Sequence, residues 1–309
     1  MPISEPILKV KGLKQHFQIS GGHTVRAVDG VDFVIYPGET YGLVGESGSG
    51  KSTIGRSLIR LYDPTAGHIE FGGMDVSGKM TRGVTSRLRT EMQMIFQDPM
   101  SCLNPRKKVG EIIGQGLEIH HIGKNTAERK AKVAEMLEKV GLAPEHADRY
   151  PHQFSGGQRQ RVGIARALIM NPKLVIADEC ISALDVSIQA QVVNLMKDLQ
   201  SQTGTTYLFI AHDLSMVKYI SDRIGVLHLG HLVETGTTDE IFENPIHPYT
   251  QSLLSAIPRP NPQVEKSRES KSYDAKAEGV VYNKGVQHHL GGEHYVLATP
   301  EELQRWTAK

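Results

Sequence analysis

The sequence predicts an α/β fold in which a buried parallel β-sheet carries polar residues at its strand ends. Three apolar, partly β-branched segments predict buried strands, at residues 39–44, 174–177 and 206–211. Glycine-rich or acidic residues or a histidine follow each of them. Because ligands of open parallel sheets bind outside the carboxyl ends of the strands, we expect these residues to gather at one edge.

The segment after the first of these strands is the best-defined motif in the chain. It reads Gly45-Glu46-Ser47-Gly48-Ser49-Gly50-Lys51-Ser52-Thr53 and fits the phosphate-binding pattern G-x-x-x-x-G-K-[ST]. Helical apolar spacing follows at 53–61, so glycine N–H groups and a helix N-terminus would point at one anion. Lys51 would reach the β- and γ-phosphates, and the Ser52 hydroxyl would bind Mg²⁺.

Composition narrows the class of protein. The 309 residues suit one large or two modest domains, and 35 Lys and Arg against 34 Asp and Glu give no electrostatic basis for binding nucleic acid. No apolar run approaches the roughly 18 residues of a membrane span, and we expect no signal peptide. Cys102 and Cys180 do not form a disulfide framework and suit a reducing cytosol. The paired histidines at 120–121 and 288–289 lack a nearby ligand set.

The first third of the chain predicts strands and then a helical region. Strands are expected at 7–11, 25–36, 67–73 and 92–97. Phe17, between the first two, could stack on a nucleotide base, although composition alone favours core packing. The fourth strand ends in Gln97, and prolines stop it in the segment 98–106. Apolar residues at helical spacing then predict an inserted helical subdomain over roughly 98–165.

The second half supplies further candidate site residues. Ser155 is a plausible N-cap, and Gly156, Gly157 and Gln158 open a helix that reaches residue 170. At the next strand end, Asp178 suits a Mg²⁺ site and Glu179 suits the positioning of a water. Ser182 to Asp185 begin another helix, and His212 ends the strand at 206–211. Two short strands at 223–227 and 231–234 close the core, and apolar residues return at 285–309 as in a small appendage.

With these motifs in order, residues 5–240 resemble the ATP-binding subunits of ABC transporters. The resemblance implies a RecA-like P-loop NTPase core with an antiparallel β subdomain and the inserted helical subdomain, with ATP and Mg²⁺ bound. The segments that carry it resemble Walker A (Gly45–Thr53), the Q-loop (Gln97), the signature (Phe154–Gln158), Walker B with the catalytic glutamate (Leu174–Glu179), the D-loop (Ser182–Asp185) and the switch histidine (His212).

The same resemblance implies roles for single residues. Glu179, His212 and Lys51 would be catalytic, and Ser52, Gln97 and Asp178 would serve the metal. The base-stacking aromatic would fall on Phe17, with His23 as the competitor. In this family two ATPase chains close head to tail, so the signature residues Ser155, Gly156, Gly157 and Gln158, together with Asp185, would act on the partner's nucleotide site.

A narrower resemblance concerns residues 98–106 and 244–254, which look like those of oligopeptide and dipeptide importer ATPases. Residues 292–296 resemble the tail of their F-type subunit, and the tail lacks the cysteines that hold an iron–sulfur cluster in some relatives, so none is expected. The implied domains are 1–240 and a C-terminal extension at 241–309. The implied partners are a sister ATPase, two transmembrane permease chains and, indirectly, an extracytoplasmic peptide-binding protein, at the cytoplasmic face of the membrane.

Other functions stay open at this point. The same motor could serve uptake of nickel, glutathione or antimicrobial peptides, because the ATPase does not touch the cargo. A soluble ABC ATPase of translation or DNA repair is disfavoured, since the chain has one cassette and no sustained heptads. A regulatory subunit that hydrolyses ATP poorly is disfavoured by the intact Glu179, signature and His212.

Overall fold

The structure is a computed structural model that describes residues 5–257, 273–275 and 277–308. Its strands are β1 (Leu8–Gln18), β2 (Thr24–Ile35), β3 (Thr40–Val44), β4 (Ala66–Phe71), β5 (Met74–Asp75), β6 (Met92–Ile95), β7 (Leu174–Asp178), β8 (Thr206–Ala211), β9 (Arg223–His228), β10 (His231–Thr237), β11 (Val286–Gly291) and β12 (His294–Ala298). Its longer helices are α1 (Lys51–Leu58), α2 (Arg82–Glu91), α4 (Val109–Ile119), α5 (Thr126–Lys139), α6 (Gly156–Leu168), α7 (Val186–Thr203), α8 (Leu214–Ile220), α10 (Pro248–Ser255) and α12 (Pro300–Thr307). Short helical turns are α3 (Pro99–Cys102), η1 (Pro144–Asp148), η2 (Pro151–Gln153), α9 (Thr238–Glu243) and η3 (Tyr282–Lys284).

The main sheet confirms the predicted parallel arrangement. Its eight strands lie in the order β11-β12-β10-β9-β3-β8-β7-β6, and the five from β9 to β6 pair in parallel. Both faces of this sheet are buried, which explains the unbroken apolar run of β7: Leu174 and Ile176 pack into one core, and Val175 and Ala177 pack into the other. The carboxyl ends of β3, β6, β7 and β8 therefore meet at one edge.

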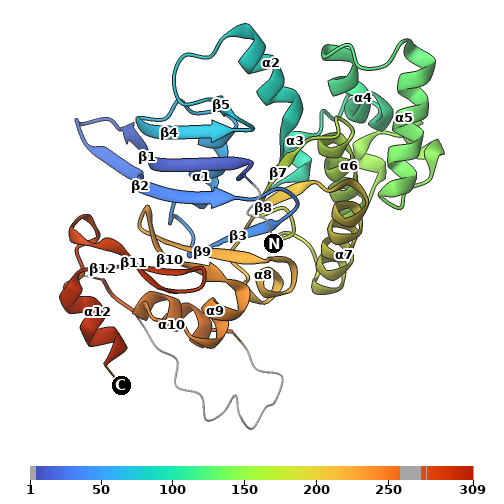
Figure 1. Cartoon of the computed structure of the whole chain (residues 1–309). Helices are drawn as coiled ribbons and strands as arrows, with labels where there is room; N and C mark the ends of the chain where they lie inside the picture. Colours follow the sequence, from blue (N-terminus) through green and yellow to red (C-terminus); the bar gives the residue numbers. More distant parts are fainter. Residues whose placement is uncertain (1–4, 258–272, 276, 309) are drawn as a thin grey trace.

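A second, four-stranded antiparallel sheet lies beside the core, in the order β2-β1-β4-β5 (Figure 1). The strand expected at 7–11 extends to Gln18 in the structure, so Phe17 lies on β1 itself. Register shifts between Val10 and Leu13 and between Gln15 and His16 interrupt the alternation along β1. That interruption hid the second half of the strand from the sequence pattern.

The helical region forms a separate lobe on the opposite side of the main sheet from the antiparallel sheet (Figure 1). Helices α4, α5 and α6 pack their apolar faces together around Ile113, Leu117, Leu137 and Val162, all fully buried. Helix α7 begins at Val186 rather than in the segment 182–185, since Asp185 is its extended N-cap.

The C-terminal segment joins the main sheet. Strand β12 pairs antiparallel with β10 through Glu234↔Val296 and Thr235↔Tyr295, and β11 pairs with β12. The sequence predicts a small appendage over residues 285–309, whereas the structure places β11 and β12 of that segment in the central sheet, followed by the helix α12. The division of the chain at residue 240 stays a prediction.

Candidate nucleotide site

The glycine loop between β3 and α1 depends on glycine at two positions. At Gly50 φ is +108°, and a Cβ there would lie 2.2 Å from the carbonyl oxygen of Ala27. A Cβ on Gly45 would lie 2.1 Å from the carbonyl oxygen of Leu227, at the end of β9. Neither position can accept a side chain, so neighbouring backbone segments press directly against the loop.

Lys51 lies at the start of α1 and folds back over this loop. Its Nζ donates hydrogen bonds to the carbonyl oxygens of Gly45 and Glu46, both at 2.8 Å, and lies 3.9 Å from Oε1 of Glu179. The side chain is 3% exposed, and burial lowers the pKa of its ammonium group. Loop carbonyls and a carboxylate thus hold a buried cation beside the glycine N–H groups.

Asp178 ends strand β7 and faces the first turn of α1. Its Oδ1 accepts a hydrogen bond from the Ser52 hydroxyl at 2.6 Å, and the side chain is 1% exposed. Among the described residues Oδ2 has no hydrogen-bond partner, and the nearest cation there, Nη2 of Arg56, is 3.8 Å away. Burial raises the pKa of this carboxyl group. A hydroxyl beside a buried carboxylate oxygen without a partner is an oxygen donor set that fits Mg²⁺.

Glu179 is the next residue and is held in an unusual backbone conformation. Its φ is +45°, the left-handed region that a glutamate adopts at a cost of about 1–3 kcal/mol. Its N–H donates to the carbonyl oxygen of Ile210 on β8 at 2.9 Å. The carboxylate Oε2 accepts a hydrogen bond from Gln97 Nε2 at 2.8 Å and lies 3.8 Å from Nδ1 of His212. The structure therefore brings together the ends of β6, β7 and β8, as expected.

The segment Phe154–Gln158 is built as a helix start. Ser155 caps α6: its Oγ accepts from the N–H of Gln158 at 3.3 Å, and Gln158 Oε1 accepts from the N–H of Ser155 at 3.0 Å. A Cβ on Gly157 would lie 2.7 Å from Ile188 of α7, so this glycine also has a packing reason within the chain. Across the described residues, no hydrogen bond or ion pair joins Ser155–Gln158 to the glycine loop.

The base-stacking position remains a choice between two residues. Phe17 is half-buried on β1, and its ring meets Tyr62 edge to face at 5.2 Å between centroids. His23 is exposed in the turn between β1 and β2. The Phe17 ring is aromatic and half-buried, and a half-buried aromatic ring at this position suits stacking on a base. Phe17 stays the predicted base contact.

Two residues that belong to the site were missed from the sequence. Arg56 lies one helical turn after Ser52 and so on the same face of α1. Because Ser52 was expected at the same metal site as Asp178, this spacing could have placed Arg56 near Asp178 as well. Tyr249 lies in α10, and its hydroxyl accepts a hydrogen bond from the N–H of Glu46 at 2.9 Å. No local pattern links residues 203 positions apart in the sequence.

The strand order, the glycine loop and the converging acids define a P-loop ATPase of the ABC type. The family model described as "ABC transporter" matches residues 28–182, and that described as "Oligopeptide/dipeptide transporter, C-terminal region" matches residues 233–283. The solved structure of cbiO1 from Clostridium perfringens, described as part of the ABC transporter complex cbiONQ, is 28% identical with a TM-score of 0.68, and the match covers 77% of this chain and 91% of that one. The dimeric MJ0796, described as a bacterial ABC transporter cassette, is also 28% identical, with a TM-score of 0.67 over 75% of this chain and 98% of its own.

Similarity to characterised sequences spans almost the whole chain. The oligopeptide transport ATP-binding protein OppF of Bacillus subtilis (strain 168) is 56% identical over 99% of this chain and 100% of its own length. The dipeptide transport ATP-binding protein DppF of Lactococcus lactis subsp. cremoris is 52% identical over 98% of this chain and 97% of its own. The chain therefore belongs to the oligopeptide and dipeptide transport ATP-binding proteins of the ABC transporter family.

Proposed function

We propose that this chain is the ATP-hydrolysing subunit of an importer that takes up oligopeptides or dipeptides, and that it is the F-type of the two ATPase subunits. The observation that carries the proposal is the convergence on one edge of the sheet of Lys51, Ser52, Asp178, Glu179 and Gln97. Relatives named for oligopeptide and dipeptide transport match from end to end, which supports the peptide cargo.

In this proposal the polyphosphate of ATP lies along Gly45–Thr53, where Lys51 exchanges loop carbonyls for the β- and γ-phosphates. Ser52, Asp178 and Gln97 would hold Mg²⁺, which when bound offsets charge on the phosphates. Glu179 would polarise the attacking water, and its hydrogen bond to Gln97 keeps the carboxylate aimed at the site. His212, on the other side of Glu179, would contact the γ-phosphate.

The second ATPase chain would complete the site. Ser155, Gly156, Gly157 and Gln158 lie at the positive end of the α6 dipole. Within the part of the chain that the structure describes, they form no hydrogen bond or ion pair with this chain's own loop. They and the helix cap Asp185 would therefore meet the γ-phosphate side of a partner, whose signature would in turn meet Lys51 and Ser52. Because only the closed pair makes both sets of contacts, ATP binding would drive closure. We propose a sister chain as that partner.

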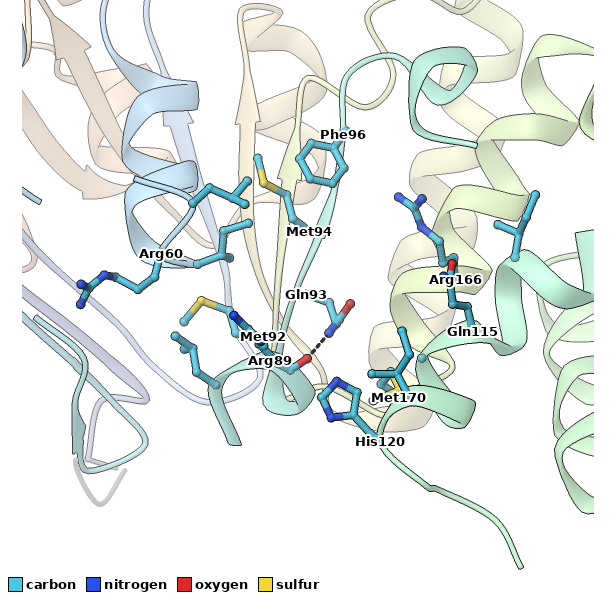
Figure 2. Close-up of a pocket in the computed structure, with 16 residues that line it drawn as sticks. Arg60, Arg89, Met92, Gln93, Met94, Phe96, Gln115, His120, Arg166 and Met170 are labelled. Atoms are coloured by element: carbon cyan, nitrogen blue, oxygen red, sulfur yellow. Dashed lines mark hydrogen bonds between the residues drawn. The ribbon is translucent and has the colours of Figure 1, made fainter. Parts of the chain in front are cut away.

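A groove between the core and the helical lobe would receive a permease chain. It has a volume of about 500 Å³ and is lined from both lobes, as Figure 2 shows for Arg60, Met92 and Phe96 on one side and His120 and Met170 on the other. Leu61 and Ile119 line it while 57% and 61% exposed. Phe96 precedes Gln97, which bonds Glu179, so movement in the groove would reach the catalytic carboxylate.

The remaining parts of the proposal concern location and division of the chain. No helix in the described ranges is both long enough and apolar enough to cross a membrane. We propose that the chain lies at the cytoplasmic face through two permease chains, with an extracytoplasmic peptide-binding protein acting indirectly. Residues 1–240 would form the ATPase domain, with its helical subdomain at about 98–165, and residues 241–309 would form the C-terminal extension.

The test is to purify the tagged full-length chain from detergent-solubilised membranes and to identify what comes with it. We expect two permease chains and a second ATPase. Leu61→Arg, which puts a charge into the groove, should lose the permeases but keep ATP binding. Val286→Arg, at the same 57% exposure on β11, is the matched control and should keep them. Recovery of the chain alone, or equal loss in both variants, would contradict the transport assignment.

A further inference from the structure

A side chain from the C-terminal extension, residues 241–309, reaches the nucleotide loop. Tyr249, on α10, is 1% exposed, and its hydroxyl accepts a hydrogen bond from the N–H of Glu46 at 2.9 Å. Glu46 is the second residue of the glycine loop. Tyr249 therefore binds the backbone of the glycine loop directly, although it belongs neither to the loop nor to the flanking strand β3 and helix α1.

The ring of Tyr249 is fixed against the same strand that presses on the loop. It packs on the ring of His228 with centroids 4.0 Å apart and an angle of 33° between the planes. His228 follows Leu227, whose carbonyl oxygen leaves no room for a Cβ at Gly45. Tyr249 and the end of β9 thus act on neighbouring loop residues, Glu46 and Gly45.

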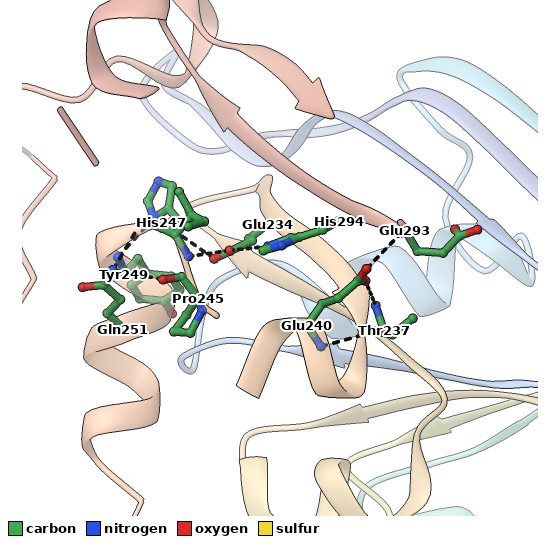
Figure 3. Close-up of polar contacts among 10 residues, drawn as sticks. Glu234, Thr237, Glu240, Pro245, His247, Tyr249, Gln251, Glu293 and His294 are labelled. Atoms are coloured by element: carbon green, nitrogen blue, oxygen red, sulfur yellow. Dashed lines mark hydrogen bonds and ion pairs between the residues drawn. The ribbon is translucent and has the colours of Figure 1, made fainter. Parts of the chain in front are cut away.

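The helix that carries Tyr249 is itself held by buried polar contacts, which Figure 3 shows. His247 Nδ1 accepts a hydrogen bond from the Tyr249 N–H at 3.1 Å and so caps the helix. The Glu234 carboxylate on β10, fully buried, accepts from the N–H groups of Ile246 at 2.7 Å and His247 at 3.1 Å. His294 on β12 adds a contact of 2.8 Å to the same carboxylate. These bonds leave the α10 N-terminus little freedom to move.

We propose that Tyr249 is a positioning residue for the nucleotide: its hydroxyl holds the Glu46 peptide in the orientation that ATP binding needs. The inference rests on the proposed ATP site. A loop rich in glycine samples many backbone conformations, and ligand binds only the fraction that is competent. A fixed acceptor for the Glu46 N–H raises that fraction. The C-terminal extension would then set the affinity of the site for ATP.

The test compares two variants of the full-length chain that each lose one buried tyrosine hydroxyl. Tyr249→Phe keeps the ring against His228 and removes the acceptor for Glu46. Tyr41→Phe is the matched control: Tyr41 is fully buried on β3, and its hydroxyl bonds Thr235 Oγ1 at 3.1 Å, away from the loop. With Mg²⁺ present, we expect the Kd for ATP to rise about 5- to 30-fold in Tyr249→Phe and to stay unchanged in Tyr41→Phe.

A second measurement keeps the role in the loop apart from a loss of stability. Amide hydrogen exchange in a peptide covering residues 45–49 should speed up in Tyr249→Phe only. Equal Kd values and equal exchange in the two variants would overturn the inference and leave Tyr249 a packing residue. If the unmodified chain binds no ATP, or binds it as tightly after Lys51→Ala, the proposed ATP site fails instead.

Discussion

Removing the Ser52 hydroxyl is expected to destabilise the chain even when no nucleotide is present. Asp178 is 1% exposed. In the described ranges the 2.6 Å bond from Ser52 is the one hydrogen bond to its side chain, since Oδ2 accepts none there. A hydrogen bond to a charged group contributes about 1.5–3 kcal/mol. Arg56 remains 3.8 Å away and burial already favours the protonated acid, so we take about 2 kcal/mol for Ser52→Ala.

The assay is thermal unfolding of the full-length chain in chelator, followed by intrinsic fluorescence. For a chain of this size we expect Tm to fall by about 4 °C in Ser52→Ala. Ser57→Ala is the control: Ser57 lies on the same helix, fully buried, and its Oγ donates to the neutral carbonyl of Thr53 at 2.8 Å. Alanine favours helix, so this change should cost less than about 1 kcal/mol.

Addition of ATP with Mg²⁺ then tests the metal role separately. A ligand that binds only the folded chain raises stability by about 2.7 kcal/mol at one hundred times its Kd. The unmodified chain should gain its full ligand-dependent rise in Tm, and Ser52→Ala should gain clearly less. Equal Tm values for Ser52→Ala and Ser57→Ala without ligand would refute the reasoning about the buried carboxylate.

Three further predictions follow from the site and the C-terminal segment. Glu179→Gln should keep ATP binding and trap the closed pair while steady-state hydrolysis falls at least about 100-fold, and unchanged hydrolysis would contradict its role. Ser155→Arg should leave this chain's own loop loaded but empty the partner's site, so counting should find one nucleotide per pair instead of two. Burial lowers the pKa of His247 to about 3, so as the pH falls the unfolded chain takes up a proton on this histidine before the folded chain does. The free energy of unfolding should therefore decrease as the pH drops from about 6.5 towards 3, by about 2 kcal/mol at pH 5. The Tm of His247→Asn should depend less on pH over this range.

Most of the parallel core could be predicted from sequence, because buried strands and glycine loops leave local signals. Successive side chains of β7 point into two different cores, so every residue of the strand is apolar up to Asp178. The two acids that follow this apolar run therefore lie at the carboxyl edge of the sheet. The contact of Gln97 with Glu179 follows from that geometry, since β6 and β7 are adjacent and parallel. The left-handed φ of Glu179 leaves no trace in the sequence, because nothing there marks a non-glycine residue for that conformation.

What could not be predicted depends on pairing between distant segments. Strand β12 joins β10 with some 60 residues between their partners, and the contact of Tyr249 with Glu46 spans the whole core. Such contacts are decided by how complete surfaces fit, which no window of neighbouring residues contains. The second half of β1 could not be predicted for a local reason. Its register shifts remove the alternation of buried and exposed residues that identifies a strand in a sequence.

The two C-terminal strands also bear on solubility. Strand β10 is largely buried, with Leu232 and Val233 in the cores, and without β12 its outer backbone groups would lie open to pairing with another chain. Strand β12 covers that edge, and the new outermost strand, β11, is short and carries His288 and His289 amid mostly exposed positions. A six-residue edge with the polar side chains of Gln287, His288 and His289 at its centre is a poorer template for strand addition than the longer, largely buried β10. Strands β11 and β12 thus cover a sheet edge that would otherwise be open to edge-to-edge aggregation.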